Sequence, residues 1–128
     1  MALTLCLLLT CAIPSASAID AKVTELMTKP LEGSPDKEVT MLLVEYPPGA
    51  RDPAHRHNAS VFVYVLDGSI IMQMKGGEKV TLHPGQTFYE DPKGIHQVGE
   101  NASTKKPAKF VAVLVKDKGA AIFVPIKE

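Results

Sequence analysis

Apolar and β-branched residues recur along the chain in short runs, and the residues between the runs are typical of turns. The runs are EVTMLLVEY, SVFVYVLDG, SIIMQMKGG, KVTLH, TFYE, KFVAVLVK and AIFVPI, and they are separated by PPG, DG, KGG, HPG, DPKG and DKG. Short strands punctuated by glycine and proline indicate a sandwich or a barrel. Only AKVTELM, at residues 21–27, has a helical period. The pattern therefore predicts an all-β domain.

The beginning of the chain has a different composition. MALTLCLLLTCAIPSASAID carries no charged side chain before Asp20, and its apolar run, residues 3–13, is followed by a proline and the small residues Ala16-Ser17-Ala18. This order is typical of a secretory signal peptide, and the run is too short to span a bilayer stably. We expect cleavage after Ala18, a mature domain at residues 19–128, and a periplasmic or secreted location. A buried N-terminal strand is the alternative.

Charge and cysteine content narrow the classes of function. The chain has 128 residues, enough for one domain, with 14 basic and 14 acidic side chains. This balance gives no electrostatic reason to expect a nucleic acid or an anionic membrane surface as a partner. Cys6 and Cys11 both lie in the predicted signal peptide. The mature domain would therefore have no disulfide, no thiolate nucleophile and no thiolate metal ligand.

Candidate metal ligands begin with a His-x-His pair in PPGARDPAHRHNASVFVYVLDGS, residues 47–69. Side chains alternate between the two faces of a strand, so His55 and His57 share one face and Arg56 lies on the other. Two imidazoles on one face can ligate a single divalent ion, although a pair of surface histidines is commoner than a metal site. His96, in EDPKGIHQV, could complete the site if the fold brings it to the pair.

The spacing of these residues resembles the first of two motifs of the cupin family. That motif runs glycine, five residues, His-x-His, three residues, glutamate, six residues, glycine. With every interval kept, it falls on Gly49, His55, His57, Val61 and Gly68.

The second cupin motif is matched less completely. Gly85 and His96 stand at the family's interval, while Asp91, Lys93 and Glu100 stand at its proline, second glycine and asparagine places. The resemblance covers residues 47–101. It implies a single-domain double-stranded β-helix, or jelly-roll barrel, over residues 19–128, with a cavity at its mouth and commonly a homodimeric assembly.

The main departure from the family concerns the carboxylate ligand, whose place is taken by Val61. Carried over residue by residue, the resemblance leaves His55, His57 and His96 as ligands of a divalent metal ion. Three interpretations follow. The site has three histidines and open positions, which resembles the thiol and diketone dioxygenase branches of the family; another residue supplies a fourth ligand; or the site has lost its metal.

A fourth ligand could come from three places. If Asp67-Gly68 is a two-residue hairpin turn, Val61 pairs with Met74, which would then look into the cavity. A shift of one residue in register would present Gln73 instead. Glu90, just before the turn to His96, is the third candidate. For all three we favour a structural role over ligation: Met74 in core packing, and Gln73 and Glu90 in contact with solvent.

Charge and polarity suggest what such a site would bind. Three neutral imidazoles leave a divalent ion its full charge, which favours an anionic chelating small molecule. Iron, zinc, nickel, copper and manganese are all candidates. Val61, Val63 and Met72 would make the cavity mainly apolar. Arg51 could contact an anion at the mouth, but we favour a solvated loop arginine.

Two functions remain open from the sequence. One is a metal-dependent enzyme, a dioxygenase-like oxidoreductase acting on a small organic substrate, with the metal held by His55, His57 and His96. The other is a non-catalytic module that captures a small molecule or a metal. The sequence identifies no general base and no nucleophile, so it leaves open whether the protein is an enzyme.

Overall fold

The computed structural model describes residues 19–127 and shows an all-β jelly-roll fold. The predicted signal peptide, residues 1–18, lies outside the described residues. The strands are β1 (Lys22–Leu31), β2 (Ser34–Tyr46), β3 (His55–Arg56), β4 (Ala59–Asp67), β5 (Ile70–Met74), β6 (Val80–Leu82), β7 (Thr87–Glu90), β8 (His96–Asn101), β9 (Ala108–Asp117) and β10 (Val124–Pro125). Over residues 19–127 there is no helix, and hence none that could cross a membrane.

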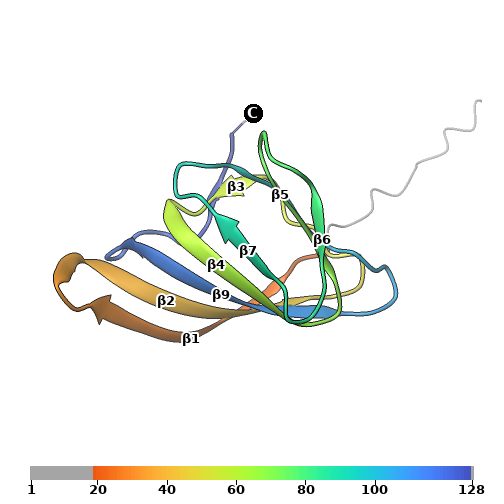
Figure 1. Ribbon diagram of the computed structural model, residues 1–128, viewed down its shortest axis with the longest axis horizontal. Helices are drawn as coiled ribbons and strands as arrows, with labels where there is room; N and C mark the ends of the chain where they lie inside the picture. The colour runs from red at the N-terminus through yellow and green to blue at the C-terminus, as the bar shows by residue number, and fades with distance from the viewer. Residues whose placement is uncertain (1–18, 128) are drawn as a thin grey trace, which may run out of the picture.

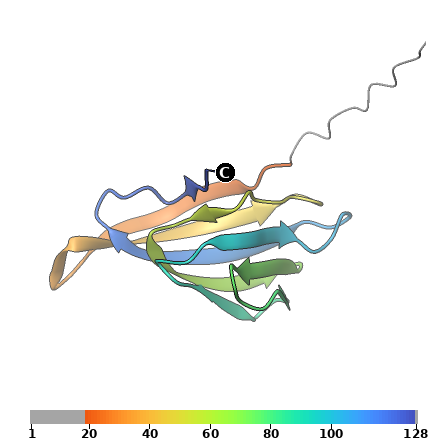
Figure 2. The same cartoon turned by 90° about the horizontal axis from the view of Figure 1, so that it is seen from above.

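The strands form two antiparallel sheets that face each other. One sheet has the order β1-β2-β9-β4-β7, and the other has the order β10-β3-β8-β5-β6. Figure 1 shows β2, β9 and β4 side by side in one layer with β3 and β5 across from them, and Figure 2 shows the same layers from above. The all-β domain predicted from short strands and turn residues is confirmed, and so is the jelly-roll barrel that the family resemblance implies.

The weak helical period at residues 21–27 does not form a helix. These residues begin β1, which pairs with β2 from Lys22↔Glu45 to Leu31↔Ser34. An isolated helix of two turns is unstable in water, whereas a hairpin with β2 satisfies the same backbone groups over ten residues.

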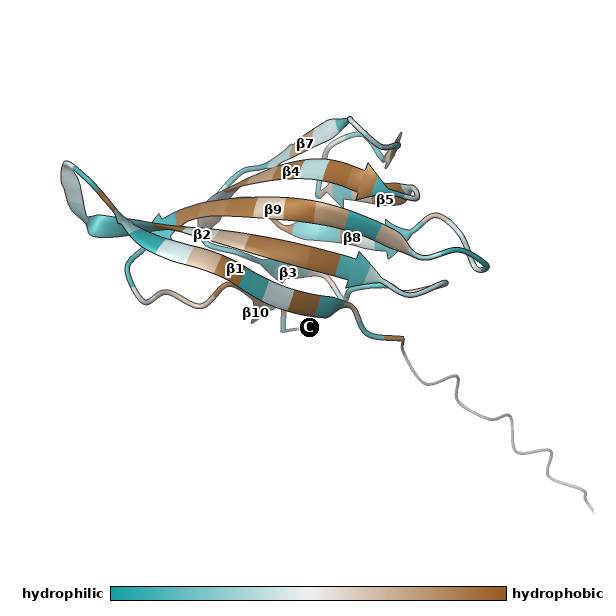
Figure 3. Ribbon diagram, turned by 90° about the horizontal axis from the view of Figure 1, so that it is seen from below, coloured by the Kyte–Doolittle hydropathy of each residue, from teal (hydrophilic) through white to brown (hydrophobic). Residues whose placement is uncertain are grey.

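The core lies between the sheets and follows the alternation of side chains along each strand. In β4, Val61, Val63 and Val65 are buried, while Phe62 and Tyr64 between them are exposed. In β2 and β9 the inward residues are mostly apolar as well: Leu42, Val44, Tyr46, Ala108, Phe110, Ala112 and Leu114. Figure 3 shows the apolar stretches of β2, β9 and β4 lying next to one another.

The chain crosses from one sheet to the other at Gly68, which corrects the predicted β4–β5 hairpin. β4 belongs to the first sheet and β5 to the second, so Val61 does not pair with Met74. Gly68 has φ 68°, and a Cβ on it would lie 2.5 Å from the Pro107 carbonyl oxygen. This glycine therefore forms a tight corner against the segment that leads into β9, and not the second residue of a hairpin turn.

The C-terminal segment returns to the His-x-His motif. β10 pairs with β3 through Val124↔Arg56 and Pro125↔His55. The Ile126 amide donates to the Ala54 carbonyl at 3.2 Å. On its other side β3 meets β8 through His55↔His96. The His-x-His motif is thus held between two segments that come from later parts of the chain.

Candidate metal centre

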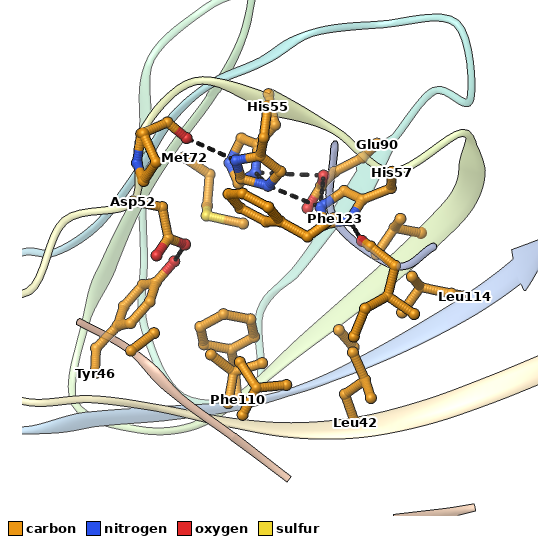
Figure 4. A pocket seen from close by; sticks show the side chains of 18 of the residues that line it. Leu42, Tyr46, Asp52, His55, His57, Met72, Glu90, Phe110, Leu114 and Phe123 are labelled. Carbon is orange, nitrogen blue, oxygen red and sulfur yellow. Dashed lines mark hydrogen bonds and ion pairs between the residues drawn. The ribbon is translucent and has the colours of Figure 1, made fainter. Parts of the chain in front are cut away.

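Three histidines and one glutamate converge inside the barrel at the end where β3, β7 and β8 meet. His55 lies in β3, His57 follows directly after it, and His96 is the first residue of β8. The fourth member is Glu90, the last residue of β7. Figure 4 shows the rings of His55 and His57 beside the Glu90 carboxylate. One ligand atom from each of the four residues lies within 4.8 Å of the others.

The separations of the donor atoms match a single coordination sphere. His55 Nε2 lies 3.0 Å from His57 Nε2 and 3.3 Å from His96 Nδ1. Glu90 Oε2 lies 3.1 Å from His57 Nε2 and 3.3 Å from His96 Nδ1. Ligands about 2.0–2.1 Å from a central ion stand about 3.3 Å apart in a tetrahedron and about 3.0 Å apart at neighbouring octahedral positions. These four separations fall in this range.

Second hydrogen bonds orient two of the imidazoles. His55 Nδ1 donates to the Pro53 carbonyl at 2.8 Å, and His57 Nδ1 donates to the Ile122 carbonyl. With the proton on Nδ1, each neutral ring directs the lone pair of Nε2 toward its neighbour. Backbone carbonyls commonly fix metal-ligating histidines in this way.

The donor set has a gap that a cation would fill. The two Nε2 lone pairs face each other, which is unfavourable unless a proton or a metal ion lies between them. Glu90 Oε2 and His96 Nε2 are buried polar atoms without a hydrogen-bond partner in the described residues. A buried carboxylate oxygen left without a partner is costly, and a bound divalent ion would remove this cost. The residues therefore fit a metal ion.

The electrostatics of the cluster depend on the Glu90 carboxylate. Burial alone would raise the pKa of Glu90, but the adjacent His57 and His96 outweigh it, so the pKa is lowered and the carboxylate stays ionised. Burial lowers the pKa values of His55 and His96. For His57 burial is again the largest effect, yet the neighbouring Glu90 carboxylate raises the pKa overall.

Glu90 corrects our expectation of a solvated side chain. Only 3% of the residue is exposed. It lies directly across from Val61 in the β4–β7 ladder, and residues in such a pair have Cβ atoms about 4.5–5.5 Å apart. Val61 occupies the place that the resemblance assigns to the family's carboxylate. The carboxylate here reaches the same region of the barrel from the neighbouring strand, which favours the interpretation with a substitute ligand.

The other residues singled out in the sequence do not belong to the cluster, although Met74 pairs with His96 in the β5–β8 ladder. Gln73 donates to the Gly77 carbonyl at 3.0 Å, and Met74 packs against Gly94. Arg51 pairs with Glu100 at 2.7 Å, and its side chain is 76% exposed. His83 is exposed and lies 2.8 Å from the Ser69 hydroxyl.

A mainly apolar cavity of about 350 Å³ opens next to the cluster. Met72 and Val61 line it, as predicted, whereas Val63 packs in the core beside it. The His55 ring stacks on Phe123, with ring centroids 4.2 Å apart. The cavity is also lined by Leu42, Val44, Tyr46, Asp52, Phe110, Leu114 and Ile122. Such a cavity fits a small organic molecule.

Sequence reasoning missed some of these residues for identifiable reasons. In TFYE, alternation places Glu90 on the same face as Phe88, which could have marked it as inward-facing. Likewise Tyr46 shares a face with Leu42 and Val44 in β2. Asp52 lies in a loop whose path depends on distant strands, so nothing local predicts its place in the cavity.

Comparisons with known proteins agree with this architecture. A family model described as a cupin domain matches residues 42–114. A DMSP lyase from Ruegeria pomeroyi has a TM-score of 0.67 and 22% identity, covering 83% of this chain and 51% of the lyase. The chain thus spans about half the length of that enzyme. No curated protein matches the chain.

Two further solved structures show the same fold. A protein with a double-stranded β-helix domain from Klebsiella pneumoniae has a TM-score of 0.65 and 19% identity, over 91% of this chain and 90% of that one. A recombinant oxalate oxidase in complex with glycolate has a TM-score of 0.64 and 22% identity, over 91% of this chain and 60% of that one. At these identities the likeness shows the fold alone.

Proposed function

Because the chain belongs to the cupin family, we propose that it binds one divalent metal ion through His55, His57, His96 and Glu90 and holds a small organic ligand beside it. The observation that carries the proposal is the buried Glu90 oxygen without a hydrogen-bond partner, facing two imidazole nitrogens at 3.1 and 3.3 Å. Three nitrogens and one oxygen suit iron, zinc, nickel, copper or manganese.

The charge of the site differs from that of a centre with histidines alone. With Glu90 ionised, a divalent ion in the site would keep one net positive charge instead of two. The proposed ligand is still anionic at the end that meets the metal, but the attraction is weaker than three histidines alone would give. A carboxylate or an enolate oxygen is the group that this charge favours.

The reaction we propose is that of a dioxygenase-like oxidoreductase on a small organic substrate. A metal in the site would supply Lewis-acid or redox chemistry. The protein's own residues orient the ligand nitrogens, exclude water with Phe123 and Ile122, and surround the substrate with apolar walls. The solved oxalate oxidase holds glycolate, which supports a small oxygenated substrate here. A non-catalytic module that captures such a molecule is the alternative.

Titration calorimetry with zinc and ferrous iron, followed by oxygen-uptake assays, tests both parts of this proposal. We expect micromolar or tighter binding of one ion per chain by the wild type, and strong loss in His55→Ala, His57→Ala and His96→Ala. Oxygen uptake with a small oxygenated acid would support the oxidoreductase. Metal binding without uptake of oxygen would favour the binding module, and no metal binding would overturn the site.

We also propose that the chain is exported and assembles as a homodimer. The order of residues in MALTLCLLLTCAIPSASA supports cleavage after Ala18. Mass spectrometry of the secreted or periplasmic protein should then give a mature start at Ile19, whereas an intact Met1 on protein recovered from the cytoplasm would contradict it.

The homodimer is supported by exposed aromatic residues on the outer face of β4 and β7, namely Phe62, Tyr64 and Tyr89.

A further inference from the structure

A second polar group faces the cavity at a distance from the four candidate ligands. Tyr46, at the end of β2, is almost fully buried, and its hydroxyl donates a hydrogen bond to the Asp52 carboxylate. Figure 4 shows this pair at the left of the cavity, the histidines and Glu90 at its top, and Phe110 below them. We call Tyr46 and Asp52 the dyad.

The dyad presents a hydrogen-bond acceptor to the cavity. The Tyr46 hydroxyl proton is already used by Asp52 Oδ2, and Asp52 Oδ1 accepts no hydrogen bond from residues 19–127. The loop does not depend on this carboxylate for its path, because the Asp52 amide donates to the Gly99 carbonyl at 2.9 Å. Asp52 lines the cavity and is only half-buried, so its free oxygen is accessible to a ligand.

The dyad and the candidate metal centre are close enough for one small molecule to reach both. Gly99 lies between them without a side chain: a Cβ on it would lie 3.1 Å from the Tyr46 hydroxyl oxygen and 2.8 Å from His96 Cε1. Between the two polar ends the cavity wall is apolar, formed by Met72 and Phe110. A ligand would therefore need polar atoms at both ends and little between them.

We propose that the dyad determines ligand specificity by accepting a hydrogen bond from a hydroxyl or ammonium group of the ligand. This inference rests on the proposed metal site and adds the class of ligand: a short organic acid whose carboxylate or enolate oxygen meets the metal and whose other end carries a donor. A site built to hydrogen-bond a donor discriminates strongly against the analogue that lacks it, because its own polar atom is left unpaired.

Matched pairs of acids test the proposal on the zinc-loaded protein. The probes are propionate with 3-hydroxypropionate and butyrate with 4-hydroxybutyrate, each titrated by calorimetry. In the wild type we expect the hydroxyl member of at least one pair to bind about tenfold more tightly than its partner. Asp52→Asn should reduce this ratio, and Asp52→Ala, which removes the acceptor, should bring it close to one.

The ratio of the two affinities within a pair of acids shows whether the dyad determines specificity or has only a structural role. A dyad that merely holds the loop would weaken both members of a pair equally when it is changed. Zinc affinity and thermal melting of the variants should stay near the wild type, and Asp36→Asn, an exposed aspartate, serves as the control. Zinc binding without a hydroxyl preference in either pair, or a preference that survives in Asp52→Ala, overturns this inference alone. Absence of zinc binding overturns the proposed function and the inference with it.

Discussion

Each face of the β4–β7 ladder carries one pair of residues that departs from what a soluble barrel leads one to expect. On the inner face Val61 lies opposite Glu90, and on the outer face Phe62 lies opposite Tyr89. The charged residue is buried at 3% exposure, while Phe62 and Tyr89 are 52% and 48% exposed. A buried carboxylate is costly and an exposed aromatic pair promotes association. Each departure supports one of the two binding roles proposed above: a cation on the inner face and a second copy of the chain on the outer face.

Removing the negative charge of Glu90 should have the largest effect on zinc binding. Glu90→Gln keeps the size of the side chain but takes away the negative ligand, and should weaken zinc binding by about 100-fold or more. Glu78→Gln, at an exposed glutamate outside the site, should bind zinc like the wild type. Calorimetric titration of both variants checks the prediction. Equal zinc affinity in the two would mean that Glu90 is not a ligand.

Adding one methyl group beside the centre should have a smaller effect on the same affinity. In Gly99→Ala the new Cβ would lie 2.8 Å from His96 Cε1 and 3.2 Å from its Nε2, so the ring must shift. Displacing one ligand in this way should cost roughly tenfold in zinc affinity. Zinc titration of Gly99→Ala gives the answer, with Gly77→Ala in the exposed β5–β6 turn as the control. An unchanged affinity would show that His96 is not held where the site needs it.

Zinc affinity should depend gradually on pH, because zinc and protons compete for His57. Its pKa is raised above the ordinary value of 6.5 by Glu90, so near neutral pH part of the protein carries a proton that metal must displace. The pKa values of His55 and His96 are lowered, and these rings are already neutral there. Zinc affinity should therefore rise with pH up to the pKa of His57, by at most about tenfold per pH unit, and level off above it.

The pKa of His57 can be followed directly by NMR titration of the metal-free protein. Glu90→Gln should move it downward, because the group that raises it is gone and burial remains. In the wild type the protonated form of His57 stabilises the fold below pH 6.5, and this contribution is lost as pH rises through the raised pKa. A zinc affinity that is flat from pH 6 to 8 would contradict this account of the site.

Substitutions on the outer face of the β4–β7 ladder should have the smallest effect on zinc affinity and a clear effect on dimer formation. Phe62→Ser with Tyr89→Ser removes two exposed rings whose centroids lie 5.3 Å apart. We expect zinc affinity to stay within about twofold of the wild type, while sedimentation changes from dimer to monomer. A monomeric wild type would rule out the homodimer.

Local sequence patterns predict the strands, and the family resemblance adds three of the four candidate ligands. Alternation and turn residues identify β2, β4 and β9, because each strand's period depends only on which face meets the core. His55, His57 and His96 follow from the resemblance to the two cupin motifs. The helical period at residues 21–27 was misleading, since pairing with β2 outweighs a local preference.

The predictions about Met74 and Glu90 were wrong because they depend on which distant strands lie side by side. We predicted Met74 opposite Val61 from a local hairpin, but the chain turns at Gly68 into the other sheet and Val61 meets Glu90 instead. The buried state of Glu90 follows from this register and from His57 and His96, which approach it from other segments of the chain. No short-range pattern contains that information.

The most direct test of the relocated carboxylate exchanges the two inner residues. The double variant Val61→Glu, Glu90→Val moves the carboxylate from β7 to the place opposite it in β4, where the family resemblance expects it. If the barrel needs one carboxylate in this region, zinc titration should show the double variant within about tenfold of the wild type and at least about tenfold tighter than Glu90→Val alone. Double and single variants that bind zinc as tightly as the wild type, or a wild type that binds none, would contradict the account.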